Sequence, residues 1–120
     1  MTRGRRPVQA VKKAVTIAGR RGIVIMTAGT SPFDFLILGS RDPAGVKVVR
    51  TRRHIRQLCE VMENYGDAID KMRRFPPEVT GQHELWVLSP WDTLQYYIID
   101  GEKITEVSGE GVPVAGHLTV

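Results

Sequence analysis

Two segments with helical periodicity, each followed by three segments with strand character, limit what this chain can fold into. The first helical segment spans residues 8–18, where apolar side chains recur every three or four positions. The second spans residues 55–72 and stops before Pro76 and Pro77, because proline cannot continue a helix. Gly66 and Asp67 predict an interruption within it, since glycine is unfavourable in a helix interior.

Strand patterns fill the stretches between and after these helices. β-Branched and aromatic residues, which favour strands, are frequent in residues 23–26, 33–38, 46–51, 84–88, 94–99 and 103–107. Residues 33–38 are apolar on both faces, which predicts a central strand. We therefore expect an α/β chain of the α+β type, in the order αβββαβββ, with a mixed β-sheet flanked by helices.

A chain of 120 residues has the size of one domain. We expect a single domain over residues 1–120, with a loose basic N-terminus over residues 1–6 and a mobile tail containing Gly and Pro over residues 108–120. No apolar run approaches the roughly 20 residues of a membrane span, so no membrane partner is expected. The lone Cys59 fits a reducing compartment, and a cytoplasmic location is expected.

The net charge of +4 conceals an uneven distribution along the chain. Residues 1–56 contain 13 basic and two acidic residues, a balance of +11, whereas the rest contains four basic and 11 acidic residues, a balance of −7. Such asymmetry suggests a polyanionic partner, with nucleic acid the first candidate. No pattern here reads base edges, so we expect recognition of shape or backbone. The predicted nucleic-acid contacts are Arg5, Arg6, Lys12, Lys13, Arg20, Arg21, Arg52, Arg53 and Arg56.

Asp34 is the one charged residue in the apolar pattern over residues 33–38. A buried carboxylate is costly unless it is paired or binds a metal ion. The expected partners are Arg50, in the next strand pattern, or backbone donors. Such pairing is compatible with a purely structural role and with a role in a functional site.

The surroundings of Asp34 and Arg50 resemble the motifs of the PD-(D/E)xK nuclease superfamily, whose restriction-endonuclease-like fold includes archaeal Holliday-junction resolvases. Pro32 precedes Asp34 with one residue inserted, which is similar to the Pro-Asp pair of the first motif. Residues 46–53 stand where the family has acid-x-Lys, so that Arg50 takes the place of the lysine and Val48 that of the acid. The resemblance covers about residues 8–99 and implies a restriction-endonuclease-like core.

The resemblance also implies the chemistry of a metal-dependent phosphodiesterase, an endonuclease. In the family, two carboxylates bind Mg²⁺ and the lysine helps to activate water, which implies one Mg²⁺ ion at Asp34 here and a catalytic role for Arg50. Val48 supplies no carboxylate, and an arginine stays protonated and cannot act as a base. The motif is therefore eroded.

Three other residues are candidates to replace what the motif lacks. Glu60 and Glu63 are three residues apart on the second helical segment and would complete a metal site with Asp34. Lys47 would supply the catalytic cation, although a regular strand points it away from Arg50.

Four aromatic residues of the second half could stack on the bases of a single strand. Their alternation favours core and hairpin packing instead. These residues are Trp86, Trp91, Tyr96 and Tyr97.

Taken together, the patterns predict a nucleic-acid-binding domain of nuclease-like fold with an eroded catalytic motif and weak or absent activity. The predicted partner is DNA or a branched nucleic acid. One alternative is a working Mg²⁺-dependent endonuclease or junction resolvase with a rearranged site. Another is a protein-interaction or oligomerisation module, in which the basic and acidic halves meet in a homodimer.

Overall fold

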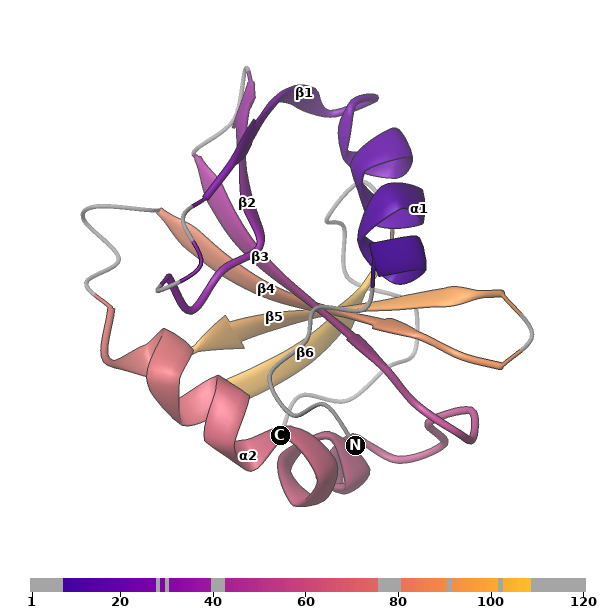
Figure 1. The fold of residues 1–120 in the computed structure, drawn as a ribbon. Coiled ribbons are helices and arrows are strands. Elements are labelled where there is room, and N and C mark those ends of the chain that lie inside the picture. The colour runs from indigo at the N-terminus through magenta and orange to yellow at the C-terminus, as the bar shows by residue number, and fades with distance from the viewer. Residues whose placement is uncertain are drawn as a thin grey trace.

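The computed structural model describes residues 8–27, 29, 31–39, 43–75, 81–90, 92–101 and 103–108 (Figure 1). In chain order the elements are α1 (Val8–Ala18), β1 (Gly22–Met26), β2 (Phe35–Gly39), β3 (Ala44–Arg50), α2 (Leu58–Arg73), β4 (Gln82–Leu88), β5 (Leu94–Asp100) and β6 (Lys103–Val107). The strands form one six-stranded sheet in sequential order. The expected α+β class with a mixed sheet is confirmed.

The sheet contains one parallel pair, β3 and β4, which α2 connects. All other neighbouring strands are antiparallel. In the parallel register, Arg50 of β3 lies beside Leu88 of β4, so the carboxyl ends of the two strands lie next to each other. The segment that leads into α2 and the turn between β4 and β5 therefore extend from the same end of the molecule (Figure 1).

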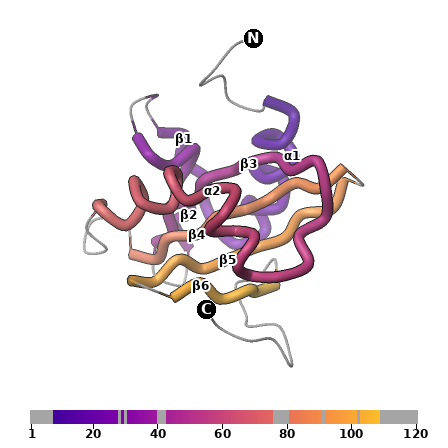
Figure 2. Tube along the Cα trace, turned by 90° about the horizontal axis from the view of Figure 1, so that it is seen from below, coloured from indigo at the N-terminus to yellow at the C-terminus, as the bar shows by residue number. Residues whose placement is uncertain are grey.

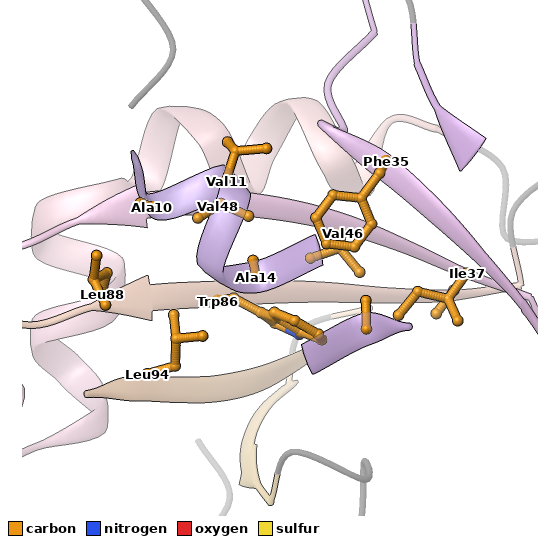
Figure 3. Packing of buried hydrophobic residues seen from close by; sticks show 12 residues of the cluster. Ala10, Val11, Ala14, Phe35, Ile37, Val46, Val48, Trp86, Leu88 and Leu94 are labelled. Carbon is orange, nitrogen blue, oxygen red and sulfur yellow. The ribbon is translucent and has the colours of Figure 1, made fainter. Parts of the chain in front are cut away.

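Each helix covers one face of the sheet, as expected. α1 packs its buried Ala10 and Ala14 against Phe35, Val46 and Trp86 (Figure 3). These alanines allow close approach of the helix to the strands because their side chains are small.

The core under α2 is separate from the core under α1. Val61, Ile69 and Met72 of α2 are fully buried and belong to one cluster with Leu85 and Tyr97 of the sheet. In Figure 2, which is seen from below, α2 lies in front of the sheet and α1 behind it. The molecule thus has three layers, helix, sheet and helix, with one hydrophobic cluster between each helix and the sheet.

Trp86 and Tyr97 are core residues, as the alternation of the aromatic residues indicates. Trp86 is 0% exposed and Tyr97 1% exposed. Tyr96 is partly buried and its ring packs edge-on against Trp86, with 4.9 Å between centroids. Trp86 and Tyr97 are therefore not available to stack on bases, and Trp91 lies outside the described residues.

The structure corrects several predicted boundaries. β2 begins at Phe35, so Asp34 lies immediately before the strand and not within it. α2 begins at Leu58 and not at residue 55, because the backbone of Ile55 forms hydrogen bonds with the side chain of Gln95. The predicted interruption of this helix is confirmed. Tyr65, directly before Gly66, has a non-helical backbone with φ of −129° and ψ of 23°.

Some expectations concern residues outside the described part. The N-terminal residues 1–6, the tail from residue 109 onward and the two prolines at 76 and 77 are among them. Neither α1 nor α2 has the length and apolar character that crossing a membrane requires.

Candidate nucleic-acid interface

A groove of about 800 Å³ opens at the carboxyl end of β3. One wall is the connection from β3 to α2, another is the first half of α2, and the β4–β5 turn adds one residue. We call residues 50–56 the arginine segment, because Arg50, Arg52, Arg53 and Arg56 come from it. The groove is lined by Arg50, Thr51, Arg52, Arg53, His54, Ile55, Arg56, Glu60, Glu63, Asn64, Tyr65 and Pro90.

The first half of the arginine segment is held by hydrogen bonds to its backbone. The N–H of Thr51 donates to the carbonyl of Leu88 over 3.0 Å, which continues the pairing of β3 with β4. The hydroxyl of Tyr65 donates to the carbonyl of Arg50 over 2.7 Å. The Thr51 hydroxyl donates to the carbonyl of Arg53 over 2.7 Å. Neighbouring elements and a local turn thus fix this stretch.

The second half is held by side chains of β5 and α2. Gln95, which is 7% exposed, accepts from the N–H of Ile55 over 3.2 Å and donates to its carbonyl over 3.0 Å. The carboxylate of Glu60 accepts from the N–H of Arg56 over 3.0 Å. Glu60 lies in the first turn of α2, where a negative charge also complements the helix dipole. The backbone of the arginine segment is therefore ordered before any ligand binds.

The arginine side chains of this segment contrast with its backbone. Arg50, Arg52, Arg53 and Arg56 are all exposed. Within the described residues, no ion pair or hydrogen bond engages their guanidinium groups. Four positive charges face the groove together with the two carboxylates of α2, so the lining carries a net positive charge.

Tyr65 connects the kink of α2 to the groove. Burial raises the pKa of its hydroxyl, which a hydrogen bond with Thr51 partly offsets. The phenol therefore stays protonated at neutral pH and remains the donor to the carbonyl of Arg50.

Asp34 is 1% exposed and lies beside the middle of β3. Its Oδ2 accepts from the N–H of Val48 over 2.7 Å and lies 3.7 Å from Nζ of Lys47. The expected pairing with Arg50 is therefore wrong, whereas the alternative expectation of a backbone donor is confirmed by the N–H of Val48. The register pairs Phe35 with Val46, so Asp34 comes opposite Lys47. Alternation along β3 directs Arg50 to the other face of the sheet.

The predicted metal ligands are not brought together. Glu60 and Glu63 line the groove with Arg50, but Asp34 is not among the lining residues. Among the described residues, no cluster of three or more His, Cys, Asp or Glu side chains has a geometry that could hold a metal ion.

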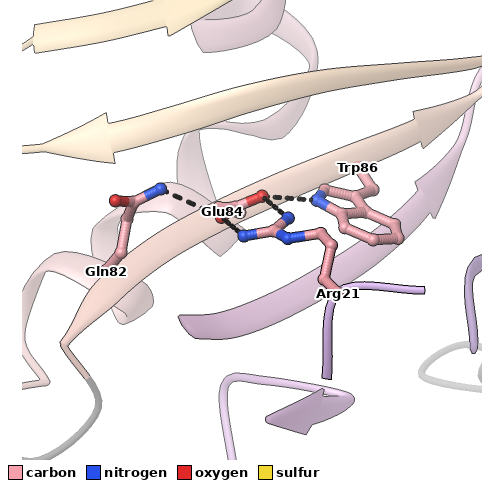
Figure 4. A network of polar contacts seen from close by, with 4 residues as sticks. All are labelled: Arg21, Gln82, Glu84 and Trp86. Atoms are coloured by element: carbon pink, nitrogen blue, oxygen red, sulfur yellow. Dashed lines mark hydrogen bonds and ion pairs between the residues drawn. The ribbon is translucent and has the colours of Figure 1, made fainter. Parts of the chain in front are cut away.

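Arg21 contributes to a buried polar network on the opposite face of the sheet from α2 (Figure 4). Its Nη1 and Nη2 donate to Oε1 and Oε2 of Glu84 over 2.9 and 2.8 Å. Gln82 Nε2 and Trp86 Nε1 donate to the same carboxylate over 3.0 and 2.9 Å. Glu84 is 0% exposed, so this network compensates a buried charge. The guanidinium of Arg21, predicted to contact nucleic acid, is used within the chain.

The other predicted contacts lie in several places. Lys13 forms an exposed ion pair of 2.8 Å with Asp92. Lys12 and Arg20 are exposed on α1 and just after it. Arg5 and Arg6 lie outside the described residues. Of the predicted set, Arg52, Arg53 and Arg56 line the groove.

The sequence patterns did not single out three residues that shape the groove and the Arg21–Glu84 network. Glu84 and Gln95 are polar residues in otherwise apolar strand patterns, the same signal that singled out Asp34. Tyr65 carries no comparable signal, because an aromatic residue on a helix is more often part of the core.

This chain was compared with protein-family models, curated proteins and solved structures. No model of a protein family, no curated protein and no solved structure matches this chain.

Proposed function

We propose that this protein binds nucleic acid through the arginine segment and the groove beside it, and that it cleaves poorly or not at all. Four exposed guanidinium groups have no partner among the residues that the structure describes, and the backbone that carries them is already held by hydrogen bonds. This combination is the observation that carries the proposal.

This combination suits the phosphates of a nucleic acid. A guanidinium group can donate two parallel hydrogen bonds to one phosphate. Each phosphate that is neutralised releases counterions, which gives affinity without reading the sequence. Because the backbone of the arginine segment is ordered in advance, binding loses less conformational entropy. The groove therefore fits a backbone-reading site for DNA or a branched nucleic acid.

We further propose that the fold is related to the restriction-endonuclease-like core. The support is a helix, an antiparallel three-stranded meander and a helix that leads to a strand parallel to β3. The position of Asp34, directly before β2 and beside β3, is compatible with the first acid of the family's motif. Since Lys47 faces Asp34, Lys47 fits the place of the family's lysine better than Arg50 does. In acid-x-Lys, the acid then corresponds to Gly45.

The groups around Asp34 do not fit a Mg²⁺ ion. Mg²⁺ keeps several water molecules and binds one or two carboxylates together with substrate phosphates. Asp34 is almost fully buried, its Oδ2 already has two partners, and Gly45 supplies no second carboxylate. A Cβ atom at Gly45 would lie only 3.0 Å from the ring of Phe33, which fills this space. One bound Mg²⁺ ion stays a prediction of the resemblance.

Binding is tested by removing two charges from the groove. In fluorescence anisotropy with a labelled DNA duplex, we expect Arg52→Ala/Arg53→Ala to weaken binding by about 10- to 100-fold at low salt. The slope of log affinity against log salt concentration should decrease by about 2, since each phosphate contact contributes about 0.9.

The matched control is Lys71→Ala/Arg74→Ala, which removes the same charge from exposed positions at the end of α2, outside the groove. We expect it to leave the affinity and the salt slope close to those of the wild type. Equal losses in both double variants, or no binding by the wild type, would show that the groove is not the site.

Cleavage is tested separately with a supercoiled plasmid and Mg²⁺ or Mn²⁺. We expect the wild type and Asp34→Asn to nick the plasmid equally little. Metal-dependent nicking that Asp34→Asn abolishes, with binding retained, would instead establish the endonuclease alternative.

A further inference from the structure

Within the part of the chain that the structure describes, the first strand of the sheet has an unpaired outer edge. Among the described residues, β1 pairs with β2 alone and ends the sheet on that side (Figures 1 and 2). Natural edge strands are usually protected from pairing with other chains by charged residues, proline or a bulge. β1 has the sequence Gly-Ile-Val-Ile-Met and contains none of the protective residue types, and its pairing with β2 is continuous.

The same strand exposes apolar side chains. Ile23 is 70% exposed, Ile25 44% and Met26 51%. Val24 between them packs against the core under α1, so alternation directs Ile23 and Ile25 to the other face of the sheet. α2 packs mainly against β4, β5 and β6, away from β1. The open edge and the uncovered apolar side chains thus coincide in one place.

We propose that β1 is a dimerisation strand, which pairs antiparallel with β1 of a second copy of this chain. Two identical strands that pair around a two-fold axis form a closed, self-complementary interface. If the axis passes by Val24, Ile23 of each copy lies opposite Ile25 of the partner subunit, so all four isoleucines meet on one face. β1 contains no charged residue, so pairing two copies of this strand brings no like charges together.

The limited size of the contact sets the expected strength. Exposed apolar patches of about 300–600 Å² on one molecule often mark an interaction site. Interfaces of less than about 1,200 Å² in total belong to weak complexes. An interface built on one five-residue strand should therefore give a reversible dimer, with a dissociation constant above roughly 1 μM.

Analytical ultracentrifugation of the full chain tests this proposal. We expect the dimer fraction of the wild type to rise with concentration between about 10 μM and 1 mM. Ile23→Lys should remain monomeric over this range, because it puts two like charges into the interface. The matched control is Val8→Lys on α1, a position that is 55% exposed and should leave dimerisation unchanged. Circular dichroism should show the same fold in all three proteins.

Other occupants of the edge would give different results. A wild type that stays monomeric while the β1 amides resist hydrogen exchange would mean that another segment of the same chain covers β1. A monomer with freely exchanging β1 amides, or equal dimerisation of Ile23→Lys and wild type, would equally overturn the proposal. Because β1 is separate from the groove, Arg52→Ala/Arg53→Ala should dimerise like the wild type.

Discussion

The arginine segment and the Arg21–Glu84 network use the same type of residue in opposite ways. In the arginine segment, hydrogen bonds hold the backbone, and the exposed guanidinium groups have no partner among the described residues. In the network, the guanidinium of Arg21 forms a bidentate ion pair with a fully buried carboxylate. An arginine is thus available for a ligand only where the fold brings no carboxylate to it, and this depends on contacts between residues far apart in the sequence.

The two regions should also differ in what their arginines contribute. An exposed arginine contributes little to folding, because water already solvates its charge. Arg21 compensates a carboxylate that has lost its water, so its removal leaves Glu84 charged and buried. Substitutions in the first region should therefore change binding, and substitutions in the second should change stability.

The largest effect is expected for Arg21→Met. Breaking a buried ion pair by removing one partner costs about 3–5 kcal/mol. We expect the free energy of unfolding, measured by urea denaturation, to fall by about this amount. The neighbouring Arg20→Met, at an exposed position, should change it by less than about 0.5 kcal/mol.

Arg21→Met alone is open to the objection that any change there disturbs packing. Arg21→Met/Glu84→Gln removes the orphaned charge and should recover part of the lost stability, because the amide of Gln still accepts from Trp86. If Arg21→Met is as stable as Arg20→Met, the contrast between the two regions does not hold.

Local patterns in the sequence predicted much of the fold. The apolar and β-branched patterns placed β1 and β6 to within one residue, and Gly66 indicated the kink found at Tyr65. These features depend on neighbours in the chain, which a single sequence contains. The boundaries of β2 and β3 were less accurate, because the turn between them is not determined by periodicity.

The candidate site was less predictable. Asp34 was recognised as a buried acid, but its partner depends on the register of β2 against β3, which brings it opposite Lys47 and not Arg50. Arg21 could not be distinguished from Arg52 by charge, because its carboxylate partner is 63 residues away in the sequence. Tertiary contacts decide both cases.

Gln95→Met is expected to act on both stability and binding. It removes both hydrogen bonds to the backbone of Ile55, and an unsatisfied buried group costs about 1–3 kcal/mol. The arginine segment loses its anchor on β5, so the affinity for a DNA duplex should fall by about 3- to 10-fold. The salt slope should stay the same, because no phosphate contact is removed.

The matched control for this positioning role is Gln82→Met in the other region. It removes one hydrogen bond to Glu84 and should reduce stability while leaving the affinity for DNA unchanged. If both glutamine variants weaken binding equally, the loss reflects general destabilisation, and Gln95 does not position the arginine segment.

The smallest effect is expected from acidification, through the buried His83. Guanidinium groups stay protonated at any pH where the protein is folded. His83, between Gln82 and Glu84 on β4, is 6% exposed and packs against the ring of Phe33 with 5.0 Å between centroids. Burial lowers its pKa below 6.5. Between this lowered pKa and 6.5 the unfolded chain binds more protons than the folded one, so stability falls as the pH decreases.

The stability contribution of neutral His83 is therefore complete above pH 6.5 and lost as the pH falls toward the lowered pKa. We expect the Tm of the wild type to fall between pH 7.5 and pH 5.5 by a few degrees more than that of His83→Phe, since about 1 kcal/mol shifts Tm by roughly 4–8 °C in a small domain. Differential scanning calorimetry at both pH values measures this difference. An equal decrease in both proteins would mean that the pH dependence originates outside β4.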